Sequence, residues 1–74
     1  MSYHDAVMAK MREDPGRTWT SGELVRAIYP EIIGTREYQT RVGSIHTVLK
    51  SAAKYGLVER IGTGPGGQIW RLTE

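Results

Sequence analysis

The sequence predicts a small α+β domain with three helices, a short strand before the second helix, and a C-terminal β-hairpin. Two observations support this prediction. Apolar residues recur at helical spacings in three segments, each of which is followed by proline or glycine. Two short β-rich runs then flank the glycine-rich segment GTGPGG near the C-terminus. The 74 residues fit one domain, 1–74, with a small hydrophobic core.

The first helix is expected over residues 3–14. Ser2 and Asp5 have the spacing of a capping box, in which the hydroxyl accepts a hydrogen bond from a backbone N–H of the first turn. The apolar positions recur one turn apart, at Tyr3, Val7 and Met11, with Met8 beside them. Pro15 and Gly16 end the helix, because the residue before proline is disfavoured in the helical conformation.

A short strand is expected at residues 17–19, and the second helix is expected over residues 21–29. Thr20 and Glu23 have capping-box spacing, so each can satisfy a backbone N–H at the start of this helix. The apolar face consists of Leu24, Val25 and Ile28. Pro30 ends the helix and begins a connection to the next one.

The third helix is expected over residues 36–55, because its apolar pattern is the most regular: Tyr38, Val42, Ile45, Leu49 and Ala52. Thr35 and Thr40 are alternative N-caps, and Thr35 is favoured because Tyr38 is in phase with the other apolar positions. Gly43 weakens the first turns, since glycine lowers helix stability. Gly56 follows the helix at the position where a left-handed backbone conformation is common.

The hairpin is expected from strands at residues 57–61 and 68–73, whose intervening glycines permit the positive φ angles of a reversal. Three glycines also match the nucleotide-binding pattern G-x-G-x-x-G: Gly62, Gly64 and Gly67. That pattern requires a following helix, whose N–H groups hold the pyrophosphate, and an acidic residue about 20 positions later. The segment QIWRLTE reads instead as a strand, so nucleotide binding is not expected.

Composition excludes several kinds of site. There is no cysteine, so disulfides and thiolate metal sites are excluded, which is typical of a reducing, intracellular setting. His4 and His46 are too few for a structural zinc site. No apolar run approaches the ~20 residues of a membrane-spanning helix. We therefore expect a cytoplasmic protein with no metal, no small-molecule cofactor and no membrane partner.

The two halves of the chain differ in charge. Residues 1–34 contain four bases and five acids, whereas residues 35–74 contain six bases and three acids. Residues 38–58 contain no acid at all. A basic half of this kind indicates an anionic partner, although an ordinary solvated surface is the open alternative.

The third helix concentrates this charge on one face. Opposite its apolar positions lie Arg36, Thr40, Gly43, Thr47, Lys50 and Lys54, with Gln39 and His46 on one shoulder and Ser44 and Ser51 on the other. Cations can neutralise phosphates, and hydroxyl, amide and imidazole groups can reach base edges in a major groove. This face favours nucleic-acid binding; a merely solubilising face stays open.

An enzyme is not expected. No paired carboxylates and no nucleophile–base arrangement are apparent in the sequence, and no residue is assigned a catalytic role. Ser44 and His46 are two positions apart on a helix, so their side chains point about 200° apart and cannot act together. A lone histidine on a helix shoulder is usually a polar surface residue, which is the alternative reading of His46.

Three stretches resemble winged helix-turn-helix domains: WTSGELVRAI, LKSAAKYGLVER and IWRLTE. They are similar to the second helix, to the end of the recognition helix with the turn that follows it, and to the last strand of the wing. The resemblance implies a three-helix bundle with the C-terminal hairpin as a wing. It also implies that the third helix enters the major groove of duplex DNA.

The resemblance assigns candidate DNA contacts by position. On the third helix they are Arg36, Gln39, Thr40, Arg41, Gly43, Ser44, His46, Thr47, Lys50 and Lys54. On the wing, which would lie along the adjacent backbone or minor groove, they are Arg60, Thr63, Gly64 and Arg71. The tip, residues 63–67, contains no Lys or Arg, so the wing is expected to contribute less than the helix. The connection after residue 29 is longer than the turn of a simple helix-turn-helix, which leaves the tilt of the third helix open.

The expected function is therefore that of a small DNA-binding, transcription-regulator-like protein. The alternative is a protein–protein interaction module, since winged-helix folds also serve that purpose. Ile32 and Ile33 need burial, either in the core or in a homodimer or partner interface. RNA binding also stays open, because the basic face does not distinguish the type of duplex.

Overall fold

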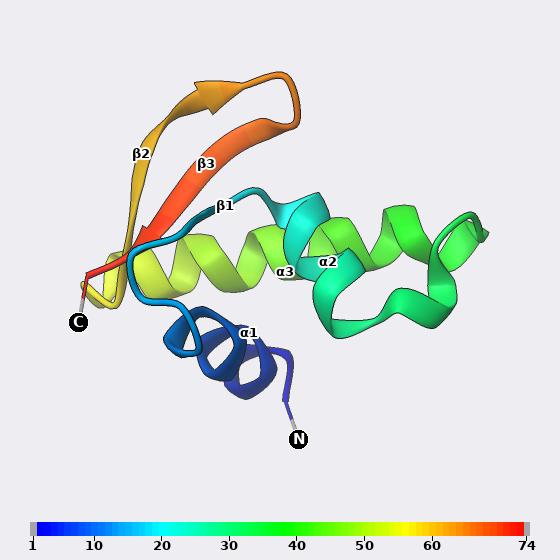
Figure 1. Cartoon of the computed structure of the whole chain (residues 1–74), viewed down its shortest axis with the longest axis horizontal. Helices are drawn as coiled ribbons and strands as arrows, with labels where there is room; N and C mark the ends of the chain where they lie inside the picture. The colour runs from blue at the N-terminus through cyan, green and yellow to red at the C-terminus, as the bar shows by residue number, and fades with distance from the viewer. Residues whose placement is uncertain (1, 74) are drawn as a thin grey trace.

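The computed structural model describes residues 2–73; Met1 and Glu74, the ends of the expected 1–74 domain, lie outside the described residues. These residues form an α+β structure with three α-helices and a three-stranded sheet (Figure 1). In chain order the elements are α1 (Tyr3–Arg12), β1 (Thr18–Trp19), α2 (Ser21–Ile28), the 3₁₀ helix η1 (Pro30–Ile32), α3 (Arg36–Lys54), β2 (Val58–Gly64) and β3 (Gly67–Leu72). The predicted α+β class is confirmed, and only η1 was not expected.

The sheet is antiparallel, with β3 as the central strand in the order β1-β3-β2. The short strand β1 pairs with β3, and Trp19 lies opposite Trp70. Strands β2 and β3 form the C-terminal hairpin, in which Ile61 is an extra residue between the paired Arg60 and Gly62. Such a β-bulge bends and twists a strand. Strand β1 thereby joins the N-terminal half of the chain to the hairpin.

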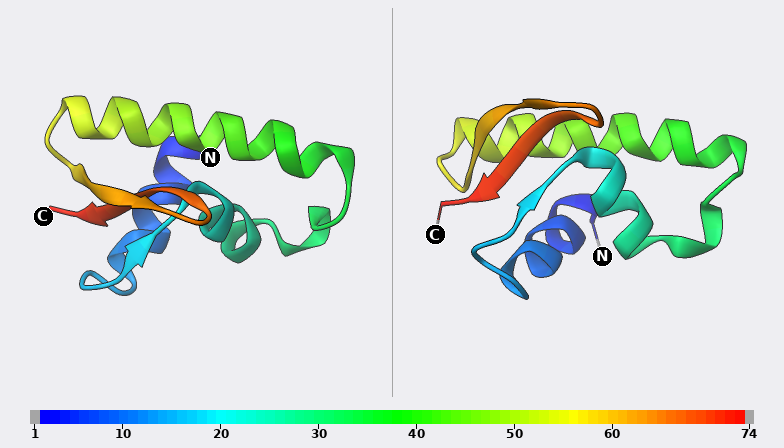
Figure 2. Two further views of the ribbon diagram at one scale, coloured as in Figure 1. Left: turned by 90° about the horizontal axis from the view of Figure 1, so that it is seen from above. Right: turned by 45° about the horizontal axis from the view of Figure 1, so that its top comes forward.

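The core lies between α3 and the other elements. Its buried residues are Val7, Met8, Met11, Trp19, Leu24, Val25, Ile32, Ile45, Leu49, Ala52, Val58, Trp70 and Leu72. Figure 2 (left) shows α3 running along one side of the molecule, with α1, α2 and the sheet all on the same side of it. The opposite side of α3 is therefore left uncovered.

Helices α1 and α2 begin at the predicted caps. The Ser2 hydroxyl accepts a hydrogen bond from the N–H of Asp5 at 3.2 Å. At α2 the capping box is complete: Thr20 Oγ1 accepts from the N–H of Glu23 at 3.2 Å, and Glu23 Oε1 accepts from the N–H of Thr20 at 2.8 Å. Each bond satisfies a backbone donor that the helix itself leaves unpaired.

Some predicted ends are wrong by one or two residues. Helix α1 ends at Arg12 rather than at residue 14, and the N–H of Asp14 donates to the Met11 carbonyl in a tighter turn ahead of Pro15. Strand β1 begins one residue later than expected, and α2 ends at Ile28 with Tyr29 as its C-cap. These ends depend on backbone geometry that periodicity does not specify.

Helix α3 begins after the predicted N-cap residue, Thr35, but the side chain of Thr35 does not form the expected capping hydrogen bond. Thr35 is the N-cap, yet its side chain makes no capping bond and donates instead to the Ile32 carbonyl at 2.7 Å. Gly34, with φ of 84°, turns the chain between η1 and α3. Thr40 lies inside the helix, so the alternative N-cap is wrong.

The end of α3 is a Schellman motif centred on Gly56, which has φ of 76°. The N–H of Leu57 donates to the Ala52 carbonyl at 3.0 Å, and the N–H of Gly56 donates to the Ala53 carbonyl at 3.1 Å. The predicted left-handed residue is confirmed, and α3 ends one residue before the predicted end at 55.

The hairpin strands are longer at the tip than expected, with paired residues continuing to Gly64 and Gly67. The sequence suggested a six-residue loop because glycine is depleted in strands. Only Gly67 among the glycines of this loop has a positive φ, at 103°. Gly64 is closely packed instead, since a Cβ there would lie 3.1 Å from Ile69 Cδ1, and the Ile69 side chain would have to shift slightly to accommodate it.

Replacing Gly56 with alanine should lower the free energy of unfolding by about 1–2 kcal/mol, because the left-handed conformation crowds a Cβ. Thermal unfolding should show a melting temperature lower by about 4–8 °C per kcal/mol. Gly16→Ala is the matched control, because the φ angle of Gly16 is not positive and a Cβ added there would meet no atom within 4 Å. Equal melting temperatures for the two variants would contradict this account.

Candidate nucleic-acid interface

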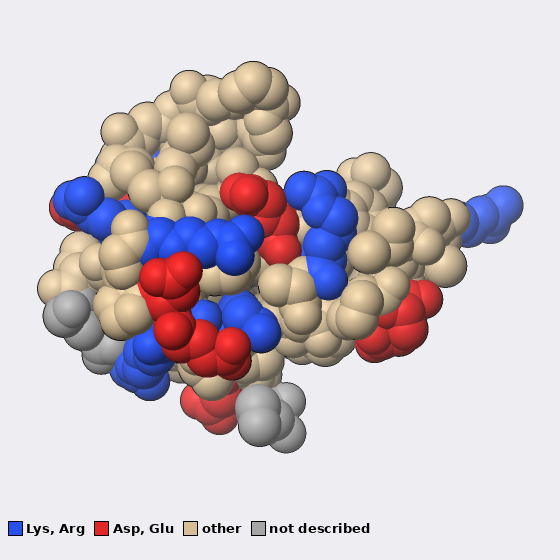
Figure 3. Space-filling model, in the orientation of Figure 1, with Lys and Arg blue, Asp and Glu red and all other residues tan. Residues whose placement is uncertain are grey.

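The uncovered side of α3 carries cations that form no ion pair among the described residues. We call this surface the basic face; its residues, Arg36, Thr40, Gly43, Thr47, Lys50 and Lys54, are all exposed. The ion pairs among residues 2–73 involve none of its three cations. Figure 3 views the molecule from the other side, where Lys, Arg, Asp and Glu are mixed.

Gly43 lies in the middle of the basic face without a structural reason to be glycine. It has no positive φ, and an added Cβ would meet nothing within 4 Å. Glycine in a helix interior costs about 1 kcal/mol relative to alanine. The fold therefore does not require the glycine, and the helix would be more stable without it.

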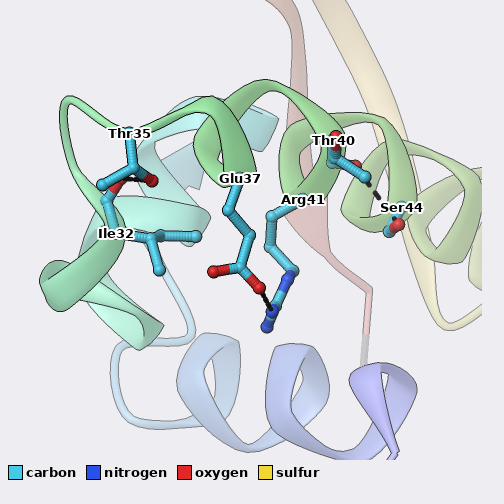
Figure 4. A network of polar contacts seen from close by, with 6 residues as sticks. All are labelled: Ile32, Thr35, Glu37, Thr40, Arg41 and Ser44. Atoms are coloured by element: carbon cyan, nitrogen blue, oxygen red, sulfur yellow. Dashed lines mark hydrogen bonds and ion pairs between the residues drawn. The ribbon is translucent and has the colours of Figure 1, made fainter.

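The hydroxyls beside Gly43 bind their own helix. Thr47 Oγ1 donates to the Gly43 carbonyl at 3.1 Å, and Ser44 Oγ donates to the Thr40 carbonyl at 3.2 Å (Figure 4). These side chains consequently stay close to the helix surface. The middle of the basic face therefore has only short side chains close to the helix backbone. Arg36 lies at one end of it, and Lys50 lies toward the other end.

Arg41 is not part of the basic face, although it was a predicted DNA contact. Its Nη2 donates to Glu37 Oε1 at 2.6 Å, and both side chains point toward α1 in Figure 4. Its guanidinium also lies 4.5 Å from the Tyr29 ring centroid and 5.0 Å from that of Tyr3. Arg41 therefore lies apart from the basic face and connects the ends of α1 and α2 to α3.

The residues around Arg41 stabilise its charged form. Burial lowers the pKa of Arg41, but the hydrogen bond with Glu37 and interactions with Tyr3, Glu37 and Tyr29 outweigh this and raise the pKa above its ordinary value. The two rings also contact each other edge to face, with centroids 6.2 Å apart. The cluster therefore combines an ion pair with two cation–π contacts.

His46 lies on the shoulder of α3 that faces the sheet. Its ring meets the buried Trp70 ring edge to face, with centroids 6.0 Å apart and planes at 69°. It is partly buried, in contrast to Gln39 and Thr40, which are exposed near the start of α3. Among the predicted contacts, His46 is the one that links α3 to the hairpin.

The two predicted arginines of the hairpin lie on opposite sides of it. Arg60 is directly across from Trp70, and residues directly opposite in an antiparallel pair share a side of the sheet. Arg71 is the next residue along β3 and so points to the other side, where it pairs with Glu59. Arg60 thus lies on the side of the sheet whose Trp70 contacts α3, and Arg71 lies on the opposite side.

The hairpin tip folds toward α2. A Cβ added at Gly66 would lie 3.4 Å from Thr20 Cγ2, at the N-cap of α2. Thr63 pairs with Gln68 and is exposed, on the same side as Trp70, whereas Gly64 is covered by Ile69. Of the two predicted tip contacts, Thr63 is therefore the accessible one.

One exposed aromatic residue was not predicted as a contact. Tyr55, the C-cap of α3, is 73% exposed and follows Lys54 of the basic face. The sequence could have indicated this exposure, because Tyr55 lies outside the apolar face formed by the regularly spaced residues of the helix.

Arg41→Ala should lower the free energy of unfolding by about 1–2 kcal/mol, the combined worth of two cation–π contacts and one exposed ion pair. Urea denaturation monitored by circular dichroism would measure it. Arg36→Ala, on the same helix but without an ion pair among the described residues, should change stability by less than about 0.5 kcal/mol. A similar loss in both variants would count against the role of the cluster.

Other kinds of site are not found in the described part of the chain. Residues 2–73 contain no detected pocket and no group of three or more potential metal ligands. None of the described helices has the length and apolar character needed to cross a membrane. Comparisons with protein-family models, with curated proteins and with solved structures give no match to this chain.

Proposed function

We propose that this chain is a winged-helix DNA-binding protein of the transcription-regulator type, which places α3 in the major groove of duplex DNA. The basic face carries the proposal, because its three cations form no ion pair among residues 2–73 and no acid lies on it. A surface helix normally carries both charge signs. A duplex, with one negative charge per ~1.7 Å of axis, supplies the missing counter-charge.

The order and pairing of the elements support the winged-helix assignment. Three helices precede a hairpin, and a short strand before α2 completes the sheet. With 19 residues, α3 is about 28 Å long, and one whole side of it is uncovered. A B-DNA major groove about 12 Å wide admits such a helix. The exposed helix face and the groove are thus compatible in size and charge.

The residues of α3 have different proposed roles. Arg36, Lys50 and Lys54 neutralise backbone phosphates, which contributes to affinity for every sequence. Gln39, Thr40 and Thr47 are exposed groups that can reach base edges. Gly43 and Ser44 allow close approach of the groove. The proposed partner is duplex DNA, and the proposed location is the cytoplasm.

Binding of a fluorescent random-sequence duplex should weaken with salt, with log K falling at a slope near −3 if three or four phosphates are neutralised. Lys50→Glu should weaken binding to every duplex by at least about fivefold at 0.15 M salt. Lys10→Glu is the control, since it makes the same charge change on α1, where Lys10 pairs with Glu13. Salt-independent binding, or equal losses in the two variants, would exclude the proposed face. A parallel titration with duplex RNA decides between the two types of duplex.

Gly43→Ala should have opposite effects on folding and on binding. The free energy of unfolding should rise by about 0.5–1 kcal/mol, because the helix gains a better helix former and no clash. DNA affinity should fall, because the added methyl lies where the groove comes closest. Ser51→Ala, on the shoulder of α3, should leave DNA affinity unchanged. Undiminished DNA affinity in Gly43→Ala would show that the centre of the basic face is not approached.

A protein-interaction module is the second candidate, and one observation favours it. Ile32 is buried, whereas its neighbour Ile33 is 51% exposed. The two residues predicted to need burial therefore separate into one core residue and one surface residue. A salt-insensitive complex that is lost in Ile33→Asp, detected by analytical ultracentrifugation, would support this candidate over DNA binding.

A further inference from the structure

The centre of the basic face, between Arg36 and Lys50, carries no charge. Thr40, Gly43 and Thr47 follow one another at helical spacing along the uncovered side of α3, and all three are exposed. None of them has a side chain longer than that of threonine. What this centre can recognise therefore depends on which chemical groups these short residues leave available.

The hydroxyl of Thr47 is directed to its own helix. Thr47 Oγ1 donates to the Gly43 carbonyl at 3.1 Å, and the neighbouring Ser44 Oγ donates to the Thr40 carbonyl at 3.2 Å (Figure 4). Each hydroxyl has a single hydrogen to donate. Neither residue therefore offers a donor to an acceptor on a base edge. The remaining branch of the exposed Thr47 side chain is its γ-methyl group.

Gly43 leaves open space beside that methyl group. It lies one turn before Thr47, and a Cβ added to it would meet no atom within 4 Å. The Cα of Gly43 and the γ-methyl of Thr47 are both carbon groups without charge or a hydrogen to donate. A small apolar group of a partner is therefore the group that fits the centre of the basic face.

The major groove of DNA presents one apolar group of this size, the 5-methyl group of thymine. Guanine, adenine and cytosine present only hydrogen-bond donors and acceptors in that groove. A methyl group placed against one of these polar groups would separate it from water without pairing it, which is unfavourable. Contact between two methyl groups instead removes apolar surface from water. The centre of the basic face is thus complementary to thymine.

We infer that Thr47, through its γ-methyl group, and Gly43 recognise the 5-methyl group of a pyrimidine in the major groove. This inference rests on the proposed DNA binding and adds a base preference to it. Thymine supplies the methyl group in ordinary DNA, and 5-methylcytosine carries the same group at the same ring position. Uracil lacks the group, so the recognised duplex is DNA rather than RNA.

The test begins with a duplex selected by the unmodified chain from a random-sequence pool. Each thymine of that duplex is then replaced singly by deoxyuridine, which removes only the methyl group, and Kd is measured by fluorescence anisotropy. At one thymine or more the affinity should fall about fourfold, the value for one buried methyl group. Cytosine and 5-methylcytosine are compared at the same position. Tighter binding of 5-methylcytosine shows that either source is accepted, and equal binding restricts the recognised methyl group to thymine.

Two variants of one residue separate the methyl group from the hydroxyl. Thr47→Ser keeps the hydroxyl and removes the methyl group, whereas Thr47→Val keeps a methyl group and removes the hydroxyl. The ratio of the affinities for the thymine and uracil duplexes should fall from about four to one in Thr47→Ser and stay near four in Thr47→Val. Thr18→Ser, which removes the same methyl group from an exposed position on β1, should keep the ratio. Circular dichroism establishes that the variants are folded, and a general loss of affinity does not change this ratio.

Several outcomes would overturn the inference. One is a ratio that is lost in Thr47→Val but kept in Thr47→Ser, which would assign the recognition to the hydroxyl. Another is a selected duplex that tolerates deoxyuridine at every thymine. If the selection enriches no sequence although the unmodified chain binds duplex DNA in a salt-dependent manner, DNA binding stands and methyl recognition is wrong. If the unmodified chain binds no duplex DNA at any salt concentration, both proposals are wrong.

Discussion

The arrangement of this small molecule depends on Trp70. Its ring is buried, its strand pairs with β1 on one edge and β2 on the other, and its edge contacts His46 of α3. Trp19, directly opposite, is buried as well, and the indole N–H groups of both have no hydrogen-bond partner among the described residues. An unpaired buried donor costs about 1–3 kcal/mol. Burying an aromatic ring of 150–250 Å² contributes about 4–6 kcal/mol, so the pair is stabilising despite its unpaired donors.

This contact relates the hairpin to the basic face. Because the Trp70 ring contacts His46, the side of the hairpin that carries Trp70 faces the shoulder of α3. Strand β1, with only two residues, adds the N-terminal half of the chain to the same sheet.

The composition of α3 reflects two requirements that conflict. Its apolar positions hold the fold together, and Arg41 adds contacts to the ends of α1 and α2. Its other side carries Gly43, which weakens the helix, and three cations that form no ion pair among residues 2–73. Departures from local stability that the fold does not require are typical of functional surfaces, where a partner supplies the missing interaction. Gly43 and the three cations of the basic face are the departures of α3 that the proposed function explains.

The sequence by itself determined the α+β class, the order of the main elements, the caps of α1 and α2, the left-handed residue after α3 and the single-sign face of α3. Each of these depends on residues that are neighbours along the chain or along one helix, so periodicity and capping rules suffice. Only the tertiary structure decided which arginines are available. Arg41 and Arg36 lie on one helix, and Arg60 and Arg71 lie on one hairpin, yet Glu37 and Glu59 compensate one member of each pair. Glu37 and Arg41 are one turn apart on α3, but the contacts of Arg41 with Tyr3 and Tyr29 depend on helix packing. The pairing of Arg71 with Glu59 depends on strand register, which brings together residues distant in sequence.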